Sequence, residues 1–95
     1  MDSRKINTDS GVILAYSIKL MDKTLVLLKG SRGYIMCGYL NMKVAEKFKD
    51  VAVKITGVST IDQALQTAVH SCSSQAKKLG IFKGQKITEV LKLIA

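Results

Sequence analysis

The feature that most constrains the fold is a series of three short apolar runs between Gly11 and Leu40, separated by two turns. Residues 21–23 form the first turn, and residues 30–33 form the second, with two glycines free to take positive φ. Turns at this spacing favour strands over helices for the runs between them. The segment is therefore predicted to be a three-stranded antiparallel meander, with strands at residues 12–18, 24–28 and 34–37.

A helix and a fourth strand are predicted to follow the meander. Asn41 can cap a short helix, because its side-chain oxygen accepts an otherwise unpaired backbone N–H. Residues 51–55 then alternate in the manner of a strand. The order strand, helix, strand favours a right-handed crossover, which makes this strand parallel to the third if both share one sheet. The helix residues expected to face inward are Met42, Val44, Ala45 and Phe48.

A longer amphipathic pattern runs from Thr60 to Leu79, with apolar residues recurring every three or four positions. Residues 71–74 are poor helix formers, so the sequence leaves open whether this helix is continuous or broken within residues 67–74. Gly80 is expected to end it as a left-handed cap. A last helix is predicted from its inward residues, Ile87, Val90, Leu91 and Ile94.

These patterns predict an α+β fold: a two-layer α/β sandwich in the order β-β-β-α-β-α-α, in which helices cover the meander and its fourth strand. Ninety-five residues suffice for a single domain spanning 1–95. Residues 1–10 are expected to be either flexible or an extra edge strand.

The overall charge and the first residues bear on location and partners. The net charge is +8, but the lysines are spread along the chain without a block of five or six like charges. The first eleven residues hold no apolar stretch of the kind a secretory signal needs, and the longest apolar run is residues 12–16. We therefore expect a cytoplasmic protein with two reduced cysteines and no membrane segment.

Three segments resemble a known family. They read GYIMCGYL at residues 33–40, GVSTID at 57–62 and AKKLGIFKG at 76–84. Together they resemble the YunC-like family of small bacterial and archaeal proteins, from about Gly11 to Ala95, and GYIMCG is the most specific string. The resemblance implies a compact two-layer α/β domain. Because the family is classed as a domain of unknown function, the resemblance implies no activity, substrate, cofactor or functional residue.

Cys37 is the first candidate for chemistry. It lies between an apolar strand and Gly38, shortly before the helix expected at Asn41. A helix N-terminus or a lysine beside the thiol would favour the reactive thiolate, and Gly38 would let a ligand approach the backbone. The simpler alternative is that Cys37 is a small buried hydrophobic side chain.

The turn at residues 30–33 is the second candidate, because backbone N–H groups together with Arg32 can hold an anion. It lacks the spacing of known phosphate-binding loops, so a plain hairpin turn is the simpler reading. The candidate ligand-binding residues are Arg32, Gly33, Tyr34, Cys37 and Gly38.

Metal and acid–base chemistry have little support. Cys37, His70 and Cys72 supply three zinc ligands where a structural site needs four, and two residues separated by one on a helix point about 200° apart. None of the seven acidic residues forms a pair spaced for acid–base work. We expect neither a metal nor a cofactor, and whether the protein is an enzyme stays open.

Three functional hypotheses remain. The first is a small binding or assembly module, a homo-oligomer, with a site around Gly33–Leu40. The second is a thiol-dependent enzyme or redox protein that uses Cys37. The third is a sequence-independent nucleic-acid binder, which rests on the positive charge and lacks any stacking motif in the sequence.

Overall fold

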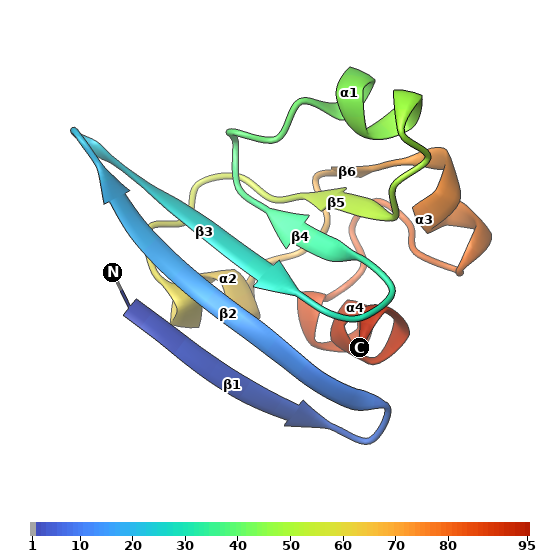
Figure 1. The fold of residues 1–95 in the computed structure, drawn as a ribbon, viewed down its shortest axis with the longest axis horizontal. Coiled ribbons are helices and arrows are strands. Elements are labelled where there is room, and N and C mark those ends of the chain that lie inside the picture. The colour runs from blue at the N-terminus through green and yellow to red at the C-terminus, as the bar shows by residue number, and fades with distance from the viewer. Residues whose placement is uncertain (1) are drawn as a thin grey trace.

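The computed structural model describes residues 2–95, which form a six-stranded mixed sheet and four helices (Figure 1). The strands lie in the sheet in the order of the sequence. The α+β class predicted from the sequence is confirmed. In chain order the elements are β1 (Asp2–Thr8), β2 (Gly11–Leu20), β3 (Lys23–Lys29), β4 (Tyr34–Met36), α1 (Met42–Lys47), β5 (Ala52–Lys54), α2 (Ile61–Gln66), β6 (Ser71–Cys72), α3 (Ser74–Lys78) and α4 (Ile87–Ile94).

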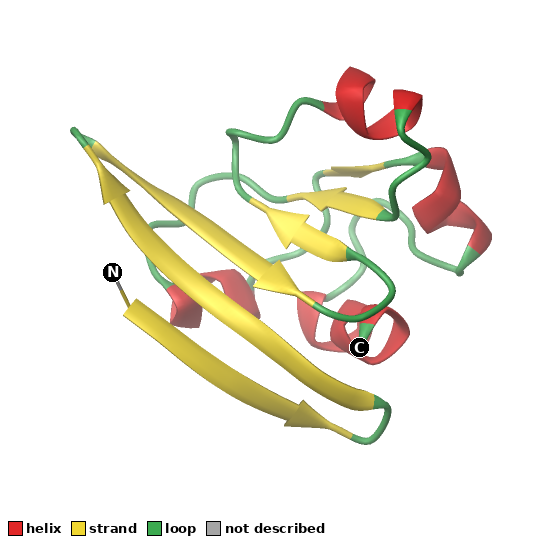
Figure 2. Cartoon of the chain, in the orientation of Figure 1, coloured by secondary structure: helices red, strands yellow, loops and turns green. Residues whose placement is uncertain are grey.

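The first four strands form an antiparallel ladder, which confirms the predicted meander. Residues 14–20 of β2 pair with residues 23–29 of β3, and residues 27–29 pair with β4. β1 extends the ladder by pairing with residues 11–17 of β2, so residues 2–8 are an edge strand. Figure 2 shows β1, β2 and β3 side by side as the longest strands of the sheet.

The second half of the sheet is mixed. β5 runs parallel to β4, with Ile35 opposite Val53, which confirms the predicted orientation of the fourth strand. β6 then pairs antiparallel with β5. Because β4 and β5 are parallel neighbours, their carboxyl ends lie together at one edge of the sheet.

Two apolar clusters lie on opposite faces of the sheet. The larger contains Ile13, Val26 and Ile35 of the sheet, packed with buried residues of α2 and α4, which lie behind the strands in Figure 1. Successive strand residues point to opposite faces, and the smaller cluster accordingly takes the neighbours Tyr34 and Met36 of β4. The predicted inward residues of the last helix are confirmed as buried: Ile87, Val90, Leu91 and Ile94. α1 supplies the cover for the smaller cluster.

The helical pattern from Thr60 to Leu79, whose continuity the sequence left open, is broken in the structure. α2 ends at Gln66, β6 occupies residues 71–72, and α3 begins at Ser74. The Ser73 hydroxyl accepts from the backbone N–H groups of Ala52 (3.0 Å) and Ala76 (3.2 Å) and donates to the Asp50 carbonyl. A serine that caps α3 and bonds the strand beside it competes with a continuous helix. The break falls inside residues 67–74, where the sequence left it open.

α1 differs from its prediction in the face it buries. Asn41 caps it as expected, accepting from the backbone N–H groups of Lys43 and Val44. Ala45 is buried, but Val44 is 47% exposed and Phe48 67% exposed, so the prediction that both face inward is wrong. A helix of six residues makes fewer than two turns, so only a narrow stripe of it contacts the sheet. No helix within residues 2–95 has the length and apolar character needed to span a membrane.

The glycines of the second turn have another role than the predicted one. Neither Gly30 nor Gly33 has a positive φ. A Cβ at Gly30 would overlap the carbonyl of Ile94, and a Cβ at Gly33 would lie 2.6 Å from Val51 Cγ1. These two glycines are required because α4 and the segment before β5 approach the turn closely. Gly80, by contrast, has φ +92°, as predicted for a left-handed cap.

Candidate functional site

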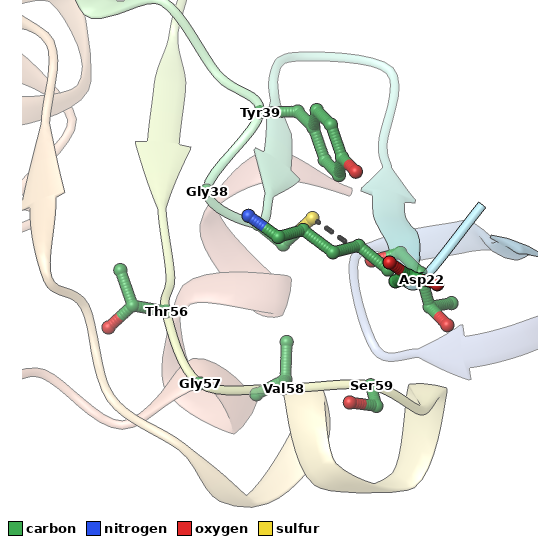
Figure 3. Close-up of a pocket in the computed structure, with 10 residues that line it drawn as sticks. Asp22, Gly38, Tyr39, Thr56, Gly57, Val58 and Ser59 are labelled. Atoms are coloured by element: carbon green, nitrogen blue, oxygen red, sulfur yellow. Dashed lines mark hydrogen bonds between the residues drawn. The ribbon is translucent and has the colours of Figure 1, made fainter. Parts of the chain in front are cut away.

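A cavity of about 480 Å³ lies at the edge of the sheet where the carboxyl ends of β4 and β5 meet. Three segments that are distant in the sequence line it: residues 22–24 at the β2–β3 turn, residues 37–39 after β4, and residues 56–59 after β5. Figure 3 shows these segments around one hollow. We call this the strand-end cavity.

The hydrogen bonds of Cys37 end β4 and shape one wall of the strand-end cavity. The Cys37 N–H donates to the carbonyl of Val26 (3.1 Å), as the next pair of the antiparallel ladder requires. A regular ladder would also have the Val26 N–H donate to the Cys37 carbonyl. Here the Val26 N–H donates to Cys37 Sγ instead (3.3 Å), and the Cys37 carbonyl accepts from the Leu40 N–H (3.0 Å). The thiol therefore replaces a backbone acceptor at the point where the chain leaves the sheet.

Cys37 is only 4% exposed, although it belongs to the cavity lining. Its thiol also donates to the Thr24 carbonyl (3.6 Å), so both of its hydrogen bonds are with the backbone of β3. Asn41 caps α1 through Lys43 and Val44 and has no hydrogen bond with the thiol. These contacts favour a packing and ladder-ending role for Cys37.

Gly38 and Gly57 leave the cavity open. A Cβ at either position would meet nothing within 4 Å, so the backbone at both faces free space. Gly57 has φ +72°, a conformation in which glycine avoids the strain of a side chain. Tyr39, 47% exposed, and Val58 lie on opposite sides of the hollow (Figure 3). A ligand in this cavity would contact main chain on two sides and an aromatic ring on another.

The lining carries hydrogen-bonding groups with little net charge. Asp22 and Lys23 contribute one negative and one positive charge. The hydroxyl-bearing residues of the lining are Thr24, Tyr39, Thr56 and Ser59. The Ser59 backbone N–H is already used, since it donates to the Gln63 side chain (2.7 Å) as α2 begins. Such a lining suits a polar molecule that is neutral or zwitterionic.

The structure divides the five residues that the sequence singled out. Cys37 and Gly38 line the strand-end cavity, whereas Arg32, Gly33 and Tyr34 line a second cavity at the opposite end of β3 and β4. The proposed region Gly33–Leu40 therefore spans both ends of one strand.

Sequence reasoning missed two parts of the strand-end cavity, residues 22–24 and residues 56–59. Residues 56–59 could have been found from the predicted parallel pairing of the third and fourth strands. Carboxyl ends of neighbouring parallel strands share an edge, so the segment after residue 55 belongs beside Cys37.

The remaining candidate ligands lie elsewhere. His70 is exposed, and its backbone N–H donates to the Lys54 carbonyl as β6 begins. Cys72 is 9% exposed, and burial raises the pKa of its thiol. Within residues 2–95, no three His, Cys, Asp or Glu side chains gather in a way that could hold a metal ion.

Comparison with known proteins shows the family to which the chain belongs. The family described as "Domain of unknown function (DUF1805)" matches residues 36–94. The uncharacterized protein YunC of Bacillus subtilis (strain 168) is 37% identical over 81 residues, covering 81% of this chain and 80% of that protein. The crystal structure of TA1206, a protein of unknown function from Thermoplasma acidophilum, superposes with a TM-score of 0.93 at 35% identity, covering 99% of this chain and 92% of that one. The chain belongs to the DUF1805 family, the YunC-like family that its sequence resembles.

Proposed function

We propose that the protein is a small-molecule-binding module whose ligand occupies the strand-end cavity. The observation that carries this proposal is the convergence of three loops on one open cavity at the carboxyl ends of the parallel strands β4 and β5. Open α/β sheets commonly bind ligands outside the carboxyl ends of their parallel strands. A volume of about 480 Å³ is also within the range of small-molecule sites.

The lining favours a ligand that combines a flat ring with hydroxyl groups. The half-exposed ring of Tyr39 offers a face for stacking, and Val58 offers an apolar contact opposite it. Asp22 can accept hydrogen bonds from ligand hydroxyl or amino groups. One acid and one base in the lining leave no net charge to attract an anion. A nucleoside has this chemistry and is the probe we choose.

Gly38 offers a clean test, because a side chain placed there projects into free space and its φ is not positive. Gly38→Leu should fill the cavity, whereas Gly38→Ala changes the backbone in a similar way with little added volume. We expect saturation-transfer NMR to detect at least one of adenosine, guanosine, cytidine and uridine on the native protein and on Gly38→Ala. The signal should vanish with Gly38→Leu, whose melting temperature should stay close to that of Gly38→Ala.

Two outcomes would count against the proposal. One is the absence of binding by all four nucleosides to the native protein. The other is binding that persists unchanged in a folded Gly38→Leu protein, which would locate the ligand elsewhere.

For nucleic-acid binding, the structure adds the exposure of Phe48. Phe48, 67% exposed, stands between Lys47 and Lys49, so an aromatic face and two cations share a short surface segment. Bases stack on such rings with little sequence preference. Fluorescence anisotropy with oligo-dT at low salt tests this function: Phe48→Ala should weaken binding if it exists, and a native protein that leaves the anisotropy unchanged rules it out.

A further inference from the structure

A second cavity, of about 360 Å³, lies at the opposite end of β3 and β4 from the strand-end cavity. Its lining comes from the end of β3, the turn at residues 30–33 and the segment between α1 and β5. We call it the turn cavity. It shares no lining residue with the strand-end cavity, so the two are separate candidate sites.

The charges around the turn cavity are unbalanced. Lys29, Arg32 and Lys49 contribute three positive charges, and Asp50 is the only acidic side chain in the lining. The single ion pair between side chains within residues 2–95 joins Arg4 to Asp62, so none of these three cations has a side-chain carboxylate within 4.0 Å. Like charges gathered at a concave surface create a positive potential that attracts an anion.

Asp50 already has a partner. The Tyr34 hydroxyl donates to Asp50 Oδ2 (3.0 Å). Burial, followed by this hydrogen bond and the Asp50 charge, raises the pKa of Tyr34 to about 12, so the phenol stays protonated near neutral pH. The pair therefore persists across the neutral range and leaves the second carboxylate oxygen as an acceptor for a ligand hydroxyl.

The backbone holds the wall of this cavity in place. The Arg32 N–H donates to the Ile94 carbonyl (2.8 Å), and the Tyr34 N–H donates to the Val51 carbonyl (3.0 Å). Arg32 Nε donates to the Ala95 backbone oxygen (3.3 Å), which leaves the two terminal nitrogens of the guanidinium for a ligand. A guanidinium fixed through Nε can still bind two oxygens of an anion side by side.

We propose that the turn cavity is an anion site for the phosphate group of a small soluble molecule, held by Lys29, Arg32 and Lys49. Phosphate suits the site because it presents several oxygens to a guanidinium and two ammonium groups at once. Free phosphate and a phosphate ester share this chemistry, and the two are compared by using sodium phosphate and glycerol 3-phosphate as probes.

The experiment follows thermal unfolding near neutral pH while phosphate replaces chloride at constant ionic strength. A ligand that binds only the folded state raises the melting temperature in a saturable way. We expect this rise with the native protein, and tighter binding of glycerol 3-phosphate if the cavity takes an ester. Arg32→Gln and Lys49→Gln should each weaken binding about tenfold or more, because each removes a charge-assisted contact. Lys78→Gln, on α3 and outside the lining, removes the same charge and should bind as the native protein does.

The native protein alone also decides the question, should a variant fail to fold. Amide NMR of Gly30 and Gly33 should show saturable shifts with phosphate. The proposal would be overturned if phosphate left the melting temperature of the native protein at its value in chloride. It would also be overturned if folded Arg32→Gln and Lys49→Gln responded to phosphate as the native protein does. Shifts that never saturate and spread over lysine-bearing segments away from the turn cavity would overturn it as well.

Discussion

Cys37 shows how one side chain decides where a strand ends and a cavity begins. Its sulfur accepts the Val26 N–H that its own carbonyl would otherwise bind, and the freed chain turns outward through Gly38. Both residues matter: position 37 is buried, which disfavours a polar side chain there, and position 38 lines the cavity at a place where a Cβ would meet open space. The Cys37-Gly38 pair therefore shapes one wall of the strand-end cavity.

Thiol labelling tests this role at the residue scale. With Cys37 4% and Cys72 9% exposed, we expect both thiols of the native protein to react with an aromatic disulfide reagent far more slowly than a free thiol. Denaturant should bring both to the free-thiol rate. Rapid labelling of native protein that is lost in Cys37→Ala would instead support the thiol-dependent chemistry considered from the sequence.

At the scale of elements, the junction between β6 and α3 depends on Ser73. Its buried hydroxyl joins the start of β5 to the start of α3, two elements that local sequence does not connect. Glu46 adds a second link, because its carboxylate accepts from both the backbone N–H (2.8 Å) and the hydroxyl (2.6 Å) of Ser74. α1 and α3 are thus held together by side chains at their ends.

Ser73→Ala should lower the free energy of unfolding by about 2 kcal/mol or more, because it removes a cap and leaves the Ala52 N–H without its partner. Urea unfolding measures the change. Thr60→Ala is the matched control, since Thr60 caps α2 at an exposed position and makes one such bond, and its loss should cost about 1 kcal/mol. Equal losses for the two variants would show that the inter-element link contributes nothing.

From the contact between Glu46 and Ser74 we predict that the stability of the fold depends on pH. The hydrogen bonds from the Ser74 hydroxyl and N–H hold the pKa of the Glu46 carboxyl below its usual value. The stabilisation is present above the unfolded-state pKa and is lost as the pH falls through the lower folded-state pKa. The melting temperature of Glu46→Gln should therefore fall less steeply than that of the native protein in this acidic range. Parallel curves would mean that the contact is not formed in solution.

Many of the helices and strands are predictable from the sequence. The meander, the Asn41 cap and the inward residues of α4 follow from local patterns, because each depends on turns or neighbours nearby in the sequence. The parallel orientation of the fourth strand follows from the rule for strand–helix–strand connections. The start of α3 does not follow from local patterns, since its cap residue Ser73 also bonds Asp50 and Ala52, more than twenty residues away in the sequence. The cavity lining at residues 56–59 was missed although the predicted parallel pairing of β4 and β5 places the segment after β5 beside Cys37.

At the scale of the whole molecule, residues 2–95 place no helix over one face of the long strands β1, β2 and β3 (Figure 2). The side chains on this face of β2 and β3 include Leu14, Tyr16, Ile18 and Leu27, all only partly buried. The homo-oligomer expected from the sequence stays a prediction, and this face is where a second copy would add most apolar burial.

Sedimentation over a range of concentrations tests that expectation. We expect a species larger than the 10.4 kDa monomer, shifted toward monomer by Leu27→Lys, because a charge at the centre of an apolar contact opposes burial. Val44→Lys, at an exposed position of α1, should leave the association unchanged. A single 10.4 kDa species at every concentration would contradict the expectation.

The two cavities can be distinguished in one measurement, because each has its own pair of glycines and glycine amides occupy a separate region of a ¹⁵N-correlated NMR spectrum. Gly38 and Gly57 line the strand-end cavity, and Gly30 and Gly33 line the turn cavity. Titration with the nucleoside that binds should shift Gly38 and Gly57 in a saturable way and leave Gly30 and Gly33 in place. Unmoved Gly38 and Gly57 amides throughout the titration would contradict the assignment of the strand-end cavity as the binding site.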